Sequence, residues 1–122
     1  LKSYPDLKVI VSPSSVGIVA AAQAVKDQGK IGKVYVTGLG LPSEMAGAVK
    51  SGASKSFAIW NPIDLGYAAT YLADDLVKGT ASKTEANMGK LGKVQLDADG
   101  NGAMAKPFVY DASNIDKFSK IF

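Results

Sequence analysis

Three short apolar runs, each followed by a segment with helical periodicity, constrain the fold of this chain more than any other feature of its sequence. The runs lie at residues 8–12, 33–37 and 55–60. The helical segments lie at residues 16–28, 43–51 and 61–78, and each is followed by a glycine. β-Branched residues in the runs favour buried strands, and the repeated strand–helix order favours right-handed crossovers. The sequence therefore predicts an α/β fold, a three-layer sandwich with a mainly parallel sheet and helices on both faces.

The last third of the chain is less regular. Thr80–Gly92 is a polar stretch rich in Lys, Ser, Thr and Gly, and it is followed by shorter elements. We predict short strands at 93–96 and 107–110, a turn at 97–102 and a closing helix at 114–120. A chain of 122 residues that is 47% apolar can build one core, so we expect a single domain at most.

Three loops follow the carboxyl ends of the predicted strands. They are Ser12–Ser15, Gly38–Gly40 and Trp60–Pro62. Parallel α/β sheets bind ligands beyond these strand ends, so the loops are candidate contacts. The Gly38 loop does not match a dinucleotide fingerprint, because the third glycine would fall at Ser43. Its glycines suit either a tight turn or the close approach of backbone to a small ligand.

Trp60 is the only tryptophan, and it precedes Asn61 and Pro62 at a predicted helix start. A ring that stacks on C–H faces beside an amide that bonds hydroxyls is typical of a sugar site. The alternative is structural, with Trp60 in the core and Asn61 as the helix cap. Both interpretations remain open at this point.

Composition removes several classes of function. The chain has no His and no Cys, which excludes Ser-His-Asp and Cys-His catalysis and nearly all zinc and haem sites. All 14 basic residues are scattered lysines, so we expect no nucleic-acid partner. We expect no enzyme activity, cofactor or metal site. No run is apolar enough to span a membrane, and no signal peptide is visible.

The segment Asp97-Ala-Asp-Gly-Asn-Gly102 resembles the first half of a calcium loop. The twelfth position of such a loop holds a bidentate Glu, whereas this chain has Phe108 there. The same residue types suit a tight turn between strands, which is the prediction we favour.

The run VTGLGLPSEMAGAVKSGASKSFAIWNPIDLGYAA, Val36–Ala69, resembles periplasmic sugar-binding proteins of ABC importers. Within that family it is most similar to the branch of rhamnose-binding and autoinducer-2-binding proteins. VIVSPSSVGIVAAAQAV early in the chain and DADGNG late in it support the resemblance, which covers the whole chain. Family members have two α/β lobes joined by a hinge, and the resemblance implies that this chain is mainly the C-terminal lobe.

The resemblance also implies a site, a ligand and a location. The candidate ligand-binding residues are Pro13, Ser14, Ser15, Gly40, Trp60 and Asn61. Gly40 falls where ribose-type relatives carry a ligand-binding Asp, so this chain departs from the family there. The implied function is capture of a small, rhamnose-like sugar in the periplasm for an ABC membrane permease. Autoinducer-2 binding and a sugar-sensing domain of a transcription regulator are the alternatives.

The resemblance implies that residues 62–90 form a helix and linker that cross the hinge, while 1–61 and 91–122 form the lobe core. Such a helix would normally be covered by the other lobe. The residues that would lose this cover are Ile63, Tyr67, Tyr71 and Leu72. Because an exposed apolar face of that size is unfavourable, we expect the helix to pack differently or to be shared in a homodimer.

Overall fold

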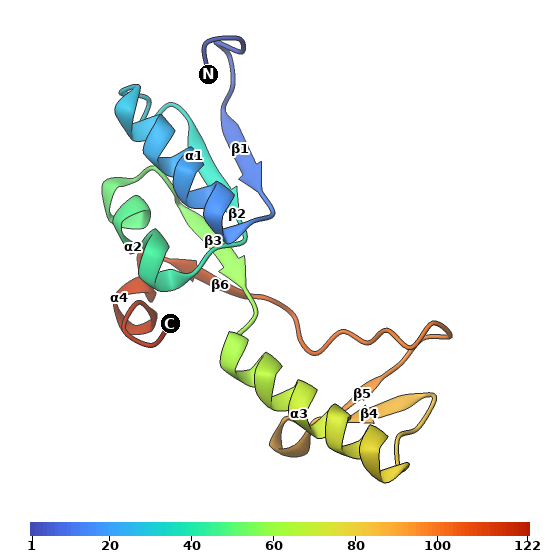
Figure 1. Cartoon of the computed structure of the whole chain (residues 1–122). Coiled ribbons are helices and arrows are strands. Elements are labelled where there is room, and N and C mark those ends of the chain that lie inside the picture. The colour runs from blue at the N-terminus through green and yellow to red at the C-terminus, as the bar shows by residue number, and fades with distance from the viewer. The chain divides into compact units, whose positions relative to one another are not determined.

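The computed structural model describes all 122 residues, and they form two compact units (Figure 1). Unit 1 comprises residues 1–59 and 108–122, and unit 2 comprises residues 60–107. None of the helices combines the length and the apolar character needed to cross a membrane.

Unit 1 is a small α/β unit of strands and helices. Its elements are β1 (Val9–Ser12), α1 (Ser15–Asp27), β2 (Tyr35–Gly38), α2 (Pro42–Ser51), β3 (Ser56–Ile59), β6 (Phe108–Asp111) and α4 (Ile115–Phe118). β1 and β2 are parallel, with Ser12 opposite Gly38, and a parallel bridge joins Leu39 to Ala58 of β3. β6 returns antiparallel to β3. The predicted α/β class is confirmed, and the three predicted strand–helix units are present.

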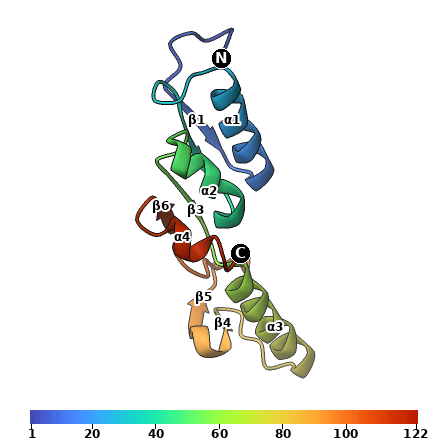
Figure 2. The same ribbon diagram turned by 90° about the vertical axis from the view of Figure 1, so that its left-hand side faces the viewer.

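Alternation along the strands decides which face of the sheet is buried. Val36, Phe57 and Tyr110 are at most 2% exposed and join the core formed with α1, α2 and α4. The helices α1 and α2 lie along this face (Figure 2). Val9 and Val11 are 47% and 70% exposed, because period-2 alternation turns them to the opposite face. In unit 1, therefore, helices cover one face of the sheet, whereas the sequence predicted helices on both faces.

Unit 2 contains one long helix and a hairpin. Its elements are α3 (Pro62–Lys78), β4 (Glu85–Asn87), the 3₁₀ turn η1 (Gly89–Leu91) and β5 (Lys93–Gln95). β4 and β5 are antiparallel, with Ala86 opposite Val94, and α3 packs on β4 and η1. Ala68 is the only buried residue of α3.

The unit boundaries differ from the expected segment 62–90. Residues 91–107 lie in unit 2, because β5 pairs with β4 and not with the strands of unit 1. β4 was not predicted, since Glu-Ala-Asn lacks the β-branched or aromatic residues that indicate a strand. The predicted strand at 93–96 corresponds to β5, and the strand at 107–110 corresponds to β6.

Candidate functional site

The loop after β1 places two of the predicted residues at the start of α1. Ser14 is the helix N-cap, and its Oγ accepts a hydrogen bond of 3.4 Å from the backbone N–H of Gly17. The buried Ser12 donates its hydroxyl to the carbonyl of Ser14 at 3.2 Å, which fixes the turn. Pro13 is exposed, and Ser15 is half-buried as the first residue of α1. The exposed side of this loop can offer hydroxyl groups to a polar ligand.

The loop after β2 packs tightly. Gly40 is buried, and a Cβ there would lie 2.9 Å from Met45 and 3.2 Å from Phe57. Gly38 has φ of 134°, and a Cβ there would lie 1.9 Å from the carbonyl oxygen of Ser12. Both glycines are thus required by close packing within unit 1. A ligand contact by Gly40 stays a prediction.

Asn61 caps α3, as one of the two open interpretations predicts. Its Oδ1 accepts hydrogen bonds from the backbone N–H groups of Ile63 at 2.9 Å and Asp64 at 3.4 Å. Pro62 occupies the first turn, where a missing N–H costs no helical hydrogen bond. The cap uses the amide oxygen, and no group of the chain accepts from the amide nitrogen of Asn61. That nitrogen can still donate to a ligand.

Trp60 opens unit 2 and does not lie in a core. Its side chain is 38% exposed, and its Nε1–H donates to the carbonyl oxygen of Ala105 at 2.6 Å. The indole lines an open hollow of about 310 Å³ together with Leu65 and the segment 102–105. The indole nitrogen is therefore engaged within the chain, whereas the ring remains accessible beside an apolar hollow.

The structure distributes the six predicted residues over both units. Within unit 1, pairing of Ser12 with Gly38 brings the loops that carry Pro13, Ser14, Ser15 and Gly40 to one edge of the sheet. Trp60 and Asn61 follow the end of β3 and belong to unit 2. Unit 1 offers hydroxyl groups, and unit 2 offers an amide and an aromatic ring. Groups of these kinds suit binding better than bond cleavage.

Sequence reasoning missed the lining around Trp60. Leu65 and Met104 border the hollow, and the carbonyl of Ala105 fixes the indole. Leu65 could have been suspected, because it lies one helical turn after Asn61. The segment 103–107 adopts neither helix nor strand, so it carries no periodic signal.

The calcium-like segment forms the predicted turn. Oδ1 of Asp97 accepts hydrogen bonds from the backbone N–H groups of Asp99 at 3.0 Å and Asn101 at 2.9 Å. The hydrogen bond from Asn101, with further turn amides, holds the pKa of the Asp97 carboxyl below its usual range. The carboxylate thus has a structural use in the turn after β5.

Comparison with protein families gives a direct match. Residues 1–81 match the model of the periplasmic binding protein domain. The chain belongs to this family.

Solved structures of transport-related proteins resemble the chain over nearly its whole length. A sugar ABC transporter protein from Actinomyces odontolyticus is 40% identical over 97% of the chain, with a TM-score of 0.77. A solute-binding protein from Clostridium phytofermentans with bound L-rhamnose is 38% identical over 100%, with a TM-score of 0.85. LsrB from Clostridium saccharobutylicum, in complex with AI-2, is 18% identical over 97% with a TM-score of 0.80, a likeness in fold alone.

The match covers only part of each relative. The chain spans 39% of the Actinomyces protein, 43% of the C. phytofermentans protein and 41% of LsrB. The predicted resemblance to one lobe of a periplasmic binding protein is confirmed at the level of the fold.

Proposed function

We propose that this chain forms part of an extracytoplasmic solute-binding protein of an ABC importer, and that its ligand is a small sugar of the L-rhamnose type. The observation that carries the proposal is the L-rhamnose-bound relative, which is 38% identical over the entire chain. The partner would be the membrane permease of the importer. The relatives are solute-binding proteins, which favours capture of a ligand without chemical conversion.

The chemistry around Trp60 supports a deoxy sugar. L-Rhamnose carries a methyl group where L-mannose carries a hydroxymethyl group. The hollow beside the indole is lined by Leu65 and Met104, which offer apolar contacts to a methyl group. The free amide nitrogen of Asn61 is a donor for a ring hydroxyl. Both contacts are part of the proposal, as are those of Pro13, Ser14, Ser15 and Gly40.

The alternatives differ in their support. Autoinducer-2 binding is the second candidate, because a fold relative is in complex with AI-2, but its 18% identity carries no residue-level argument. No observation favours the transcription-regulator alternative. Sharing of α3 between two copies stays a prediction without support from the comparisons, although Ile63 and Leu76 are 61% and 63% exposed.

An NMR titration of the ¹⁵N-labelled chain with L-rhamnose tests the proposed contacts. The indole N–H of Trp60 and the side-chain amide of Asn61 should shift, with a dissociation constant in the millimolar range because only part of the relatives' length is present. L-Mannose is the matched control and should bind more weakly. Shifts that avoid both residues, at sugar concentrations that saturate the change, would contradict the assignment of the site.

A further inference from the structure

The connection between the two units rests on two short chain segments. The chain leaves unit 1 after Ile59 and returns to it at Phe108, and these residues are opposite each other in the β3–β6 pair. We name Trp60–Asn61 the outgoing crossing and Ala105–Pro107 the return crossing. They are the only covalent links between the units, so any rearrangement of the units must bend both.

The two crossings differ in how they are held. The outgoing crossing leads directly into α3, whose start is fixed by the Asn61 cap and by Pro62. The return crossing belongs to a segment, residues 103–107, that lies in no helix or strand. The Trp60 indole donates the one hydrogen bond that reaches this segment. The other hydrogen-bonding groups of residues 103–107 have no partner in the chain.

The hydrogen bond joins residues 45 positions apart, and its length of 2.6 Å is just below the usual range of about 2.7–3.2 Å for an N–H donor and a carbonyl acceptor. Trp60 is 38% exposed, so the indole is not held in place by burial in a core. Asp97 fixes the turn that begins the path from β5, but its hydrogen bonds reach only Asp99, Gly100 and Asn101. The return crossing therefore depends on Trp60 for its position.

We propose that Trp60 is a positioning residue, whose indole N–H fastens the return crossing to the outgoing crossing. With this hydrogen bond in place, the two crossings bend as one element. Without it, the return crossing moves independently of α3. This role is separate from the proposed sugar contact, because it uses the indole N–H and leaves the ring face free.

Backbone ¹⁵N relaxation of the chain without sugar tests this role. The amides of Ala105 and Lys106 should be ordered in the wild type, with order parameters of about 0.85. In Trp60→Phe these order parameters should fall below about 0.6. The resonance of the single indole N–H gives a direct second readout, since a hydrogen-bonded indole proton exchanges slowly with water. Tyr35→Phe is the matched control, because it removes another aromatic-to-carbonyl hydrogen bond, to Gly32 at 3.3 Å in unit 1.

A second variant separates the hydrogen bond from the packing of the ring. Because the chain has one tryptophan, biosynthetic incorporation of benzothienylalanine replaces Trp60 alone and exchanges its N–H for sulfur. The inference predicts the same loss of order as in Trp60→Phe, while Tyr35→Phe leaves these amides unchanged. Order parameters that stay at the wild-type level with benzothienylalanine would overturn it. Since no sugar is used, this result is independent of the proposed function.

Discussion

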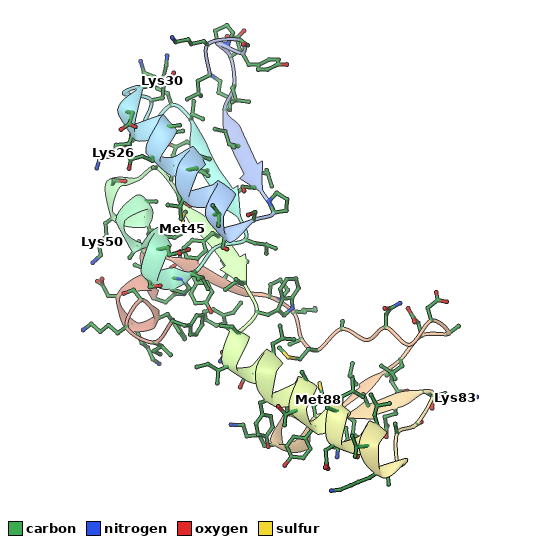
Figure 3. All side chains as sticks on the ribbon, in the orientation of Figure 1. Lys26, Lys30, Met45, Lys50, Lys83 and Met88 are labelled. Atoms are coloured by element: carbon green, nitrogen blue, oxygen red, sulfur yellow. The ribbon has the colours of Figure 1, made fainter.

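Unit 1 and unit 2 are built from the same chain but bury their apolar residues to very different degrees. In unit 1, Ile18, Val36 and Met45 are 0% exposed within one continuous core. In unit 2 the buried apolar residues are Ala68, Ala86 and Met88, at 5–7% exposed. Figure 3 shows Met45 in unit 1 and Met88 beside α3 in unit 2. Since burial of apolar surface dominates folding stability, unit 1 should supply most of it.

The candidate site residues Trp60 and Asn61 lie beside a helix with little apolar cover. α3 is capped at both ends. Three of its apolar residues, Ile63, Leu76 and Val77, are nevertheless between 61% and 88% exposed. Its hydrogen bonds and caps are complete, but its apolar cover is not. The Trp60–Asn61 pair thus lies at the start of the unit with fewer buried apolar residues, where caps and single hydrogen bonds fix the local structure.

The largest expected effect is in the core of unit 1. Phe57→Ala removes a ring that is 2% exposed and stacks on Tyr110 at 5.4 Å between centroids. The free energy of unfolding should fall by about 3–5 kcal/mol, because a cavity replaces the ring. Urea denaturation followed by far-UV circular dichroism measures it. A loss under about 1 kcal/mol would contradict the conclusion that the core of unit 1 supplies most of the stability.

A smaller loss is expected in the core of unit 2. Met88→Ala should cost about 2 kcal/mol, the low end for a buried methionine, because the surroundings of Met88 are open and can collapse. Trp60 fluorescence reports on unit 2, so the transition followed at this residue should shift more than the one followed by circular dichroism. Equal shifts of both transitions would mean that the two units unfold as one.

The cap of α3 should contribute less again. Asn61→Ala removes the acceptor of the Ile63 and Asp64 amides and should lower stability by about 1 kcal/mol. Asn61→Asp keeps an acceptor oxygen at the helix N-terminus and should be close to neutral. Thermal unfolding of both variants, followed at Trp60, measures the difference. Similar losses in the two variants would argue against the cap.

The smallest effect is electrostatic and concerns one carboxyl in each unit. The Asn101 amide lowers the pKa of Asp97 in unit 2, and the Ser113 hydroxyl lowers that of Asp111 in unit 1. For a lowered pKa, the stabilisation is complete above the unfolded value and is lost as the pH falls through the folded value. Carboxyl ¹³C titration should therefore show both groups titrating below the ordinary value of 3.8. A midpoint for Asp97 at or above that value would contradict its role in the turn.

Much of unit 1 could be predicted from sequence because its signals are local. β-Branched runs such as Val9–Val11 and the glycine after α2 each depend on neighbouring residues. The ends of these elements were therefore correct to within about two residues. Unit 2 was predicted less well, because β4 is short and polar and is stabilised by pairing with β5.

In the candidate site, too, local features could be predicted and contacts with residues distant in the sequence could not. The position of Trp60 at a strand end and the cap at Asn61 followed from their neighbours in the sequence. The partner of the indole did not, since it is a backbone carbonyl 45 residues away and any residue could supply it. The packing need for Gly40 was also missed, because Met45 and Phe57 approach it only in the folded unit.

Isothermal titration calorimetry on a chimera tests the central claim most directly. The chimera joins this chain to the part of the C. phytofermentans relative that it does not cover, and circular dichroism establishes that the chimera is folded. The account predicts binding of L-rhamnose with a dissociation constant on the order of 1 μM, weakened at least about tenfold by Trp60→Ala. A folded chimera that binds neither L-rhamnose nor autoinducer-2 would contradict the proposed function.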